Sequence, residues 1–294
     1  MDKFVIRGGT PLNGVITASG NKNAALKLLP ACLLTDQPII LHNIPDIQDV
    51  RNTILILQDL GVDVTELKPG SFRIHAKNVN KTELEPTLAG RTRASVVFAG
   101  PMLARMGAIT LPLPGGDVIG GRPLDTHVQA LSSLGVEVET NRIGKFDMHV
   151  DELRGAGYLL LAEASVTATE NAIMAAVLAK GETVIYNAAS EPHVRDLCNM
   201  LNSLGAQIEG VGTNRLRING VESLSGGEYH IGADFMEVGS FIGATAVTGG
   251  EVRIKNAGPQ NLGMVRIVYE KLGVYWLDDG NDIVIPAGQS LCIE

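Results

Sequence analysis

A leucine-glycine pair recurs four times along the chain and constrains the fold more than any other feature of the sequence. The four glycines are Gly61, Gly135, Gly205 and Gly273, separated by 74, 70 and 68 residues. Each pair is expected to end a leucine-rich helix and to be followed directly by a short strand, at 62–64, 136–138, 206–208 and 274–276. Glycine suits the position just after a helix, where a left-handed backbone is needed. The recurrence therefore predicts a repeat of about 70 residues.

Two other features recur in step with the leucine-glycine pairs. Helices rich in small residues are expected at 23–34, 93–105, 169–180 and 237–248. A β-branched strand follows each, at 38–42, 108–111, 182–186 and 251–254, and a polar turn and a last strand follow each pair, at 72–75, 146–149, 216–219 and 282–285. A first strand is expected at 4–7. Each repeat reads helix, strand, helix, strand, strand, which predicts an α/β protein with mixed sheets.

The length of 294 residues favours two domains rather than one. The core must be aliphatic, because 45% of the residues are hydrophobic but only 4% are aromatic. Four repeats are complete and a fifth barely begins. If three repeats close one domain, the second domain is unfinished, although four repeats closing in another way stays an alternative.

Charge and composition restrict the class of function. A net charge of -8 argues against non-specific nucleic-acid binding but leaves room for an anionic small molecule. The apolar run at 172–179 is too short to cross a membrane, and the chain does not begin like a signal peptide, so a cytoplasmic protein is expected. The three cysteines have no CxxC spacing and are expected to be buried thiols. No metal and no organic cofactor are expected, because no residue cluster has ligand spacing.

The stretch 115–127, GGDVIGGRPLDTH, combines four glycines with groups that handle protons or anions. Those groups are Asp117, Arg122, Asp125 and His127. A flexible loop that carries such side chains between two apolar segments is a candidate lid over an active site. A glycine-rich surface turn is the alternative.

Three of the expected small-residue helices begin with groups that suit an anion. Lys22 lies in SGNKN at 19–23, Arg93 in RTRAS at 91–95, and Ser165 in ASVTAT at 164–169. Free N–H groups at a helix start favour negative charge, and lysine and arginine add to this. Each segment alone is also compatible with an ordinary capped helix start. Because they occupy corresponding places in successive repeats, together they predict a site for a ligand with several anionic groups.

These motifs carry a resemblance to a known family. With SGNKNAAL at 19–26, RTRAS at 91–95, GGDVIGGRPLDTH at 115–127 and SVTATEN at 165–171, the chain resembles the UDP-N-acetylglucosamine 1-carboxyvinyltransferases. These enolpyruvyl transferases commit UDP-N-acetylglucosamine to peptidoglycan synthesis. The resemblance implies an inside-out α/β barrel of two domains with three repeats each. It places 1–20 with 231–294 in a discontinuous, incomplete domain, and 21–230 in a complete domain carrying loop 115–127.

The resemblance also implies roles for individual residues. Lys22, Arg93 and Arg122 would take the phosphate and carboxylate of phosphoenolpyruvate, and Asn23 would contact the reacting groups and the sugar. The uridine and diphosphate would lie along Pro123, Leu124, Asp125, His127, Ser165, Val166 and Thr167. The sugar 3-hydroxyl would add to C2 of phosphoenolpyruvate while C3 is protonated, and phosphate would then leave. The catalytic set would be Asp117, Lys22 and Arg122.

The chain departs from the family pattern at several places. Asp117 stands where a cysteine is usual, so the proton donor would be a carboxyl group, and epoxides of the fosfomycin type should alkylate it poorly. Glu163 replaces a frequent lysine and Phe235 replaces an arginine, which weakens expected nucleotide contacts. Family members continue for almost two further repeats that carry an aspartate and an arginine of the site. The chain is therefore expected to be a partial sequence with weak turnover.

Three functions remain open on the sequence. The first is enolpyruvyl transfer to UDP-N-acetylglucosamine. The second is the related shikimate-pathway transfer, which shares the fold, although the sequence of loop 115–127 favours the UDP-sugar. The third is a non-catalytic UDP-sugar-binding or interaction protein. The missing repeats and Glu163 favour it, and the intact set of Lys22, Arg93, Arg122 and Asp117 opposes it.

Overall fold

The computed structural model describes residues 3–115, 123–140 and 145–292. The chain divides into two compact units. The large unit comprises residues 22–231, and the small unit joins residues 1–21 to residues 232–294. The assignment of these units as separate domains stays a prediction.

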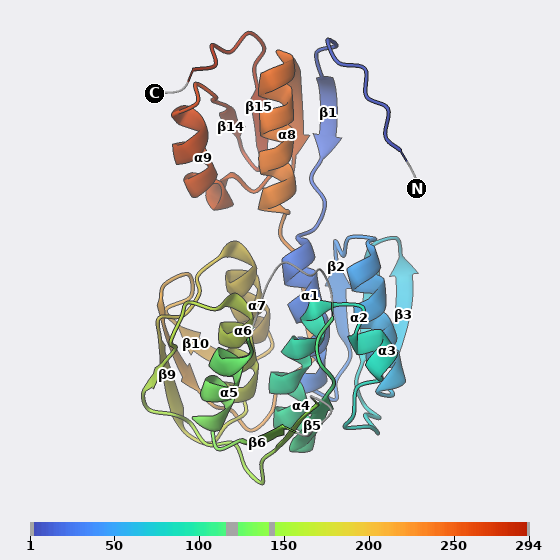
Figure 1. Cartoon of the computed structure of the whole chain (residues 1–294), viewed down its shortest axis with the longest axis vertical. Helices are drawn as coiled ribbons and strands as arrows, with labels where there is room; N and C mark the ends of the chain where they lie inside the picture. The colour runs from blue at the N-terminus through green and yellow to red at the C-terminus, as the bar shows by residue number, and fades with distance from the viewer. Residues whose placement is uncertain (1–2, 116–122, 141–144, 293–294) are drawn as a thin grey trace. The chain divides into compact units, whose positions relative to one another are not determined.

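The predicted repeat is confirmed by the order of the elements (Figure 1). The first repeat contains α1 (Lys22–Ala31) with η1 (Cys32–Leu34), β2 (Ile39–His42), α2 (Gln48–Asp59), β3 (Asp63–Lys68) and β4 (Ser71–His75). After α3 (Pro86–Ala89), the second contains η2 (Arg93–Phe98), α4 (Ala99–Met106), β5 (Ala108–Leu111), α5 (Asp125–Ser132), β6 (Glu137–Thr140) and β7 (Phe146–His149). The third contains α6 (Val166–Ala176), β9 (Glu182–Tyr186), α7 (Pro192–Ser203), β10 (Gln207–Glu209) and β11 (Arg215–Asn219).

The fourth repeat belongs to the small unit. It contains α8 (Phe235–Thr248), β13 (Glu251–Lys255), η3 (Pro259–Asn261), α9 (Gly263–Glu270), β14 (Leu277–Asp279) and β15 (Asp282–Ile285). Its core packs Val238 and Ile242 of α8 against Ile254 and Trp276, all of which are buried. Within the described residues no helix is long and apolar enough to cross a membrane.

Each repeat builds a sheet by the same rule. The strand after the first helix pairs antiparallel with the last strand, which pairs antiparallel with the middle one, as in the order β2-β4-β3. A strand from outside the repeat adds in parallel: β12 (Gly227–His230) beside β2, β8 (Leu159–Leu160) beside β9, and β1 (Asn13–Thr17) beside β13. The sheet of β5, β7 and β6 instead has one parallel bridge, between Glu83 and Thr110.

Helices rather than strands occupy the interior of the large unit. In Figure 1, α1, α4 and α6 run through the middle of this unit with the strands towards its outside. Helix α1 is buried continuously from Ala24 to Ala31, and α6 from Ala168 to Ala176. A helix that is buried all round needs small or apolar residues on every face. The alanine-rich sequences of α1 and α6 therefore explain why helices form the inner layer.

The glycines and three asparagines fix the ends of repeated elements. Gly61, Gly135, Gly205 and Gly273 all have a positive φ, as their place after a helix requires. After β2, β9 and β13, the next residues are Asn43, Asn187 and Asn256, with φ of 61°, 56° and 53°. The side chains of Asn43 and Asn187 donate to the carbonyls of Ile231 and Leu161, at 3.0 and 3.1 Å, each just beyond the parallel neighbouring strand. After β5 the corresponding residue is Pro112, whose ring excludes a positive φ.

Several sequence predictions of local structure are wrong. Residues 4–7 form no strand, because Phe4, Val5 and Ile6 are exposed and pair with no described strand, and β1 begins at Asn13 instead. The helix expected at 93–105 starts as the 3₁₀ turn η2. The last leucine-glycine pair leads to a strand at Leu277–Asp279 rather than directly after the glycine. Cys292 is exposed, although Cys32 and Cys198 are buried as expected.

Candidate active site

Helices α1, η2 with α4, and α6 contact one another close to their starts. Lys27, five residues into α1, forms an ion pair with Glu170, four residues beyond the start of α6. Asn171 of α6 hydrogen-bonds with Val96 and Gly100, which lie three and seven residues beyond Arg93. These contacts lie within about two turns of the helix starts, so the three predicted anion-binding segments lie near one another in the large unit.

The start of α1 presents a lysine at the surface. The Nζ atom of Lys22 lies 2.8 Å from Oδ2 of Asp49 on α2, and 47% of its side chain is exposed. An exposed ion pair of this kind contributes little to stability, because water screens both charges. Asn23 beside it is half-buried. The ammonium group of Lys22 is thus held in place but remains accessible to a ligand.

The start of η2 presents a half-buried arginine. Thr92 caps this turn, and its hydroxyl accepts the backbone N–H of Ala94 at 3.2 Å. Arg93 follows as the first residue of η2. Its charge acts on His127, where it lowers the pKa of the imidazole together with burial. Arg93 and His127 therefore share one local environment.

Ser165 caps helix α6 only loosely. Its hydroxyl accepts the N–H of Ala168 at 3.5 Å, which is long for a hydrogen bond. Ser165, Val166 and Thr167 are half-buried, and the Val166 side chain packs against the core. A ligand at this end would therefore meet the Ser165 and Thr167 hydroxyls and the backbone of Val166.

The second half of the predicted loop lies beside the start of α6. Pro123 and Asp125 are exposed, whereas the Leu124 side chain is buried, so a ligand contact from Leu124 would use its backbone. On the same turn, Thr126 donates to Oε1 of Glu163 at 3.2 Å. Glu163 thus brings a carboxylate next to the start of α5. Asp117 and Arg122 lie outside the described residues.

A buried network of neutral groups connects α5, α6 and η2. His127 is only 4% exposed, and burial together with the Arg93 charge lowers its pKa from 6.5 to about 4. Its Nε2 lies 3.0 Å from the Thr167 hydroxyl, and its Nδ1 lies 2.9 Å from Nδ2 of Asn171. His127 is therefore neutral at pH 7 and serves as a hydrogen-bonding group rather than a cation.

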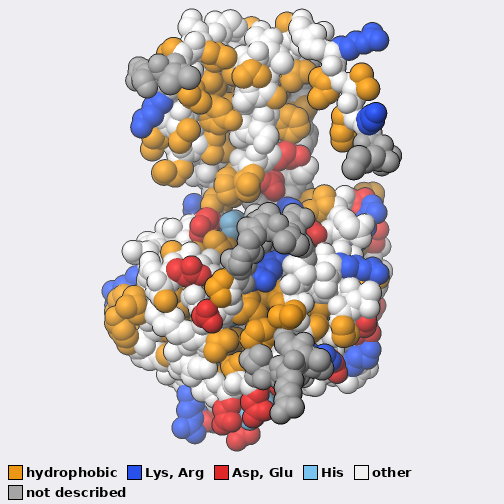
Figure 2. Space-filling view, viewed as in Figure 1, with side chains coloured by type: hydrophobic (Ala, Val, Ile, Leu, Met, Phe, Trp, Pro, Cys, Tyr) orange, Lys and Arg blue, Asp and Glu red, His pale blue; other side chains and the backbone are white. Residues whose placement is uncertain are grey.

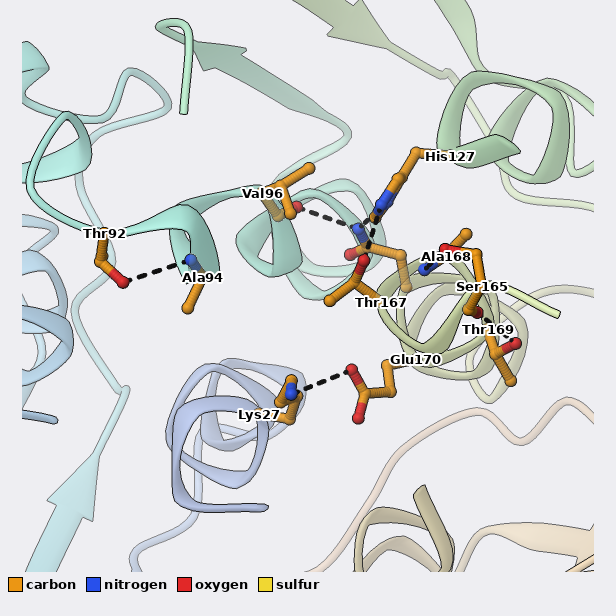
Figure 3. Close-up of polar contacts among 11 residues, drawn as sticks. Lys27, Thr92, Ala94, Val96, His127, Ser165, Thr167, Ala168, Thr169 and Glu170 are labelled. Atoms are coloured by element: carbon orange, nitrogen blue, oxygen red, sulfur yellow. Dashed lines mark hydrogen bonds and ion pairs between the residues drawn. The ribbon is translucent and has the colours of Figure 1, made fainter. Parts of the chain in front are cut away.

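A second buried contact joins α6 to α1. Nζ of Lys27 lies 3.5 Å from Oε2 of Glu170, and these side chains are 6% and 0% exposed (Figure 3). Among the described residues, neither oxygen of Glu170 accepts a hydrogen bond. Burial raises the pKa of Glu170 to about 7, although the Lys27 charge opposes this rise. The contact is electrostatic and lacks the hydrogen bonds that would normally accompany a buried carboxylate.

Sequence reasoning had not singled out Asn171, Lys27 or Glu170. A signal was present, because Glu170 and Asn171 interrupt an otherwise apolar helix, and Lys27 interrupts the apolar run of α1. Charged and amide side chains in a fully buried helix are rare unless they have partners. Their spacing alone did not indicate which partners they meet.

The comparisons with known proteins identify the family. The family model described as EPSP synthase (3-phosphoshikimate 1-carboxyvinyltransferase) matches residues 6–290. A UDP-N-acetylglucosamine 1-carboxyvinyltransferase of Treponema denticola is 49% identical over 99% of this chain, and this chain covers 68% of that protein. One of Borreliella burgdorferi is 49% identical over the whole chain, again covering 68% of the relative. The chain belongs to the UDP-N-acetylglucosamine 1-carboxyvinyltransferase family.

Solved structures support the same fold for this family member. The enolpyruvyl transferase NikO from Streptomyces tendae matches with a TM-score of 0.83 at 21% identity, over 96% of this chain and 67% of that one. EPSP synthase from Acinetobacter baumannii matches with a TM-score of 0.74 at 19% identity, over 97% and 66% of the two chains. At this identity the likeness concerns the fold alone. The predicted enolpyruvyl transferase fold is confirmed.

Proposed function

We propose that this protein transfers the enolpyruvyl group of phosphoenolpyruvate to the 3-hydroxyl of UDP-N-acetylglucosamine and releases phosphate. The observation that supports this most strongly is 49% identity to proteins of that name over almost the whole chain. The shikimate-pathway reaction has weaker support, because the solved EPSP synthases are only 19% identical to this chain. Peptidoglycan synthesis in the cytoplasm is the setting that this activity implies.

The proposed reaction is an addition followed by an elimination. The sugar hydroxyl oxygen bonds to C2 of phosphoenolpyruvate, C3 gains a proton, and the hydroxyl loses its own. The C2–O bond to phosphate then breaks as C3 loses a proton, which restores the vinyl group on the sugar. In this scheme Asp117 donates the proton to C3. Lys22, Arg93 and Arg122 stabilise the negative charge on phosphate and carboxylate.

The start of α6 and the start of α5 would hold the nucleotide part. Asn23 would contact the sugar and the reacting groups, while Pro123–His127 and Ser165–Thr167 would follow the uridine and diphosphate. Glu163 has a consequence here, because its carboxylate lies beside Thr126 and repels a nearby diphosphate. The affinity for UDP-N-acetylglucosamine should therefore be modest. A binding protein without activity is the competing proposal, and it shares these nucleotide contacts.

Phosphate release from the two substrates tests the proposal directly. With wild-type protein, release should require both UDP-N-acetylglucosamine and phosphoenolpyruvate, and shikimate 3-phosphate should not replace the UDP-sugar. Lys22→Ala should lower kcat/KM by about 100-fold, since it removes a charged contact to the transferring group. Lys81→Ala is a matched control, because Lys81 is 50% exposed and pairs with Asp59 as Lys22 pairs with Asp49. Binding of the UDP-sugar without phosphate release would instead favour the non-catalytic alternative.

A further inference from the structure

The orientation of the Asn171 side chain is fixed by two backbone groups. Its Oδ1 accepts the N–H of Gly100 at 2.8 Å, and its Nδ2 donates to the carbonyl of Val96 at 2.9 Å. The Gly100 N–H requires an acceptor and the Val96 carbonyl requires a donor. The oxygen and nitrogen of the Asn171 amide therefore cannot exchange places. Asn171 is completely buried. The second hydrogen on Nδ2 must therefore point to its remaining neighbour, Nδ1 of His127, at 2.9 Å.

The fixed amide determines the tautomer of His127. Because Nδ1 accepts a hydrogen bond from Asn171, it carries no hydrogen of its own. The imidazole is neutral, so its one hydrogen resides on Nε2. Nε2 lies 3.0 Å from Oγ1 of Thr167, and it donates to that oxygen. The Asn171 amide thus determines that His127 donates, and Thr167 accepts, in the hydrogen bond between them.

The direction of this hydrogen bond also determines the role of the Thr167 hydroxyl. A hydroxyl oxygen that accepts from His127 keeps its own hydrogen available for a different acceptor. Thr167 is half-buried in the first turn of α6, where the backbone N–H groups also attract acceptors. The positive charge of Arg93, close enough to affect His127, favours an anionic acceptor at this place.

We propose that Asn171 and His127 are positioning residues that fix the Thr167 hydroxyl as a hydrogen-bond donor to a diphosphate oxygen of the UDP-sugar. The inference rests on the proposed function for its ligand, but the tautomer depends only on the network described above. Asn171 does not touch the ligand and acts through His127. Thr167 selects ligands that offer an acceptor, which the oxygens of a nucleoside diphosphate do and a protonated amine does not.

Nitrogen-15 NMR of the intact protein tests the first half of the proposal. The His127 signals, assigned by their loss in His127→Gln, should show the Nε2–H tautomer at pH 7, with no protonation down to about pH 5. A hydrogen on Nδ1, or a protonated ring at pH 7, would overturn the proposal. This measurement needs no substrate, so its outcome is independent of the activity.

Calorimetric titration with UDP-N-acetylglucosamine tests the second half. Thr167→Val should raise Kd by about 10-fold, because it removes one hydrogen bond to a charged group, and Thr167→Ser should restore binding. Thr169→Val is the matched control on the same helix. Among the described residues its hydroxyl bonds the backbone of Ser165 and Ala189, so stability should fall while Kd stays unchanged. An unchanged Kd for Thr167→Val would refute the relay, that is, the proposed series of hydrogen bonds from Asn171 through His127 and Thr167 to the ligand. A wild-type protein that binds no UDP-sugar would instead refute the proposed function.

Asn171→Asp tests whether the amide acts through Thr167. A carboxylate can only accept, so Nδ1 must then carry a hydrogen. At about pH 9, where the imidazole is neutral, Nε2 becomes the acceptor and takes the Thr167 hydrogen away from the ligand. Kd should rise about as much as in Thr167→Val, and the double variant should show no further rise. Additive losses would assign Asn171 a purely structural role and contradict the relay.

Discussion

Helix α6 carries two adjacent buried polar residues whose surroundings differ sharply. Asn171 faces η2, α4 and α5 and has a hydrogen-bond partner for each of its polar atoms. Glu170 lies roughly 100° further round the helix and meets Lys27 of α1 at 3.5 Å, with no hydrogen bond to either oxygen from the described residues. The neutral amide is fully satisfied and specifies geometry. The carboxylate is held by charge alone, so it responds to pH and to the loss of its partner.

The largest expected effect comes from separating the charges at Glu170. Glu170→Leu leaves the Lys27 ammonium buried without a carboxylate, and the free energy of unfolding should fall by about 3–5 kcal/mol. The double variant Lys27→Met/Glu170→Leu should recover to within about 1 kcal/mol of wild type, because both members of the buried pair are then replaced by apolar side chains. Urea unfolding measures all three proteins. Full stability of Glu170→Leu alone would show that the buried Lys27 ammonium does not depend on the charge of Glu170.

The exposed pair Lys81–Asp59 provides the control for this experiment. Half of the Lys81 side chain is exposed, in contrast to 6% for Lys27. Lys81→Met should change the free energy of unfolding by less than about 1 kcal/mol. The contrast between the two lysines separates the effect of burial from the effect of pairing.

The free energy of unfolding should depend on pH in opposite directions for Glu170 on α6 and for the buried histidines on α5 and α7. Burial raises the pKa of Glu170 from 4.5 to about 7, so unfolding releases a proton and this residue lowers stability as the pH rises through that range. Burial lowers the pKa of His127 from 6.5 to about 4, so unfolding takes up a proton and His127 lowers stability as the pH falls from 6.5. His193 acts in the same direction as His127, because its pKa falls to about 3.

Glu170→Gln should isolate the contribution of the buried histidines to the pH dependence of stability. With the carboxyl group removed, stability should rise with pH between about 4.5 and 6.5 more steeply than in wild type, by up to about 1.4 kcal/mol per pH unit. Urea midpoints measured at several pH values give the two slopes. Equal slopes would mean that Glu170 is ionised in the folded protein at the lowest of these pH values.

The smallest effect is expected at the start of α6. Ser165→Ala removes a capping contact of 3.5 Å and should cost less than about 0.5 kcal/mol. Asp234→Ala in the small unit removes two caps of 3.0 and 3.2 Å and should cost about 1 kcal/mol. Thermal unfolding of both variants checks this order. A large loss in Ser165→Ala would contradict the loose capping of α6.

The sequence predicted the repeat because its signals are local. The glycines after each helix and the β-branched strands act within a few residues, and neighbouring repeats reinforce them. The pattern at Phe4–Ile6 resembles a strand just as well, but no neighbouring strand pairs with it among the described residues. Pairing, and not the pattern itself, decides whether such a segment becomes a strand.

The positions of the candidate site residues could be predicted from the sequence only where each residue begins a repeated helix. Lys22, Arg93 and Ser165 could be placed because each begins a helix at a corresponding point of a repeat. The neutral state of His127 could not be inferred, since it depends on burial by other elements and on the charge of Arg93, which lies on another element. Likewise, the Lys27–Glu170 pair joins the first and third repeats. Contacts between repeats follow from packing in three dimensions and leave no spacing in the sequence.

The left-handed asparagines after β2, β9 and β13 bear on how the chain arose. Neither the left-handed turn nor an asparagine is demanded by the proposed chemistry, yet both recur in the large unit and in the small unit. Duplication of one ancestral segment accounts for such shared but dispensable detail. The copy after β5 has exchanged its asparagine for Pro112, and it leads into the stretch 115–127. Descent from a common module thus kept the turn even in repeats that contribute to the candidate site, the first with Lys22 and the third with Ser165, whereas the second repeat lacks it just before the candidate lid.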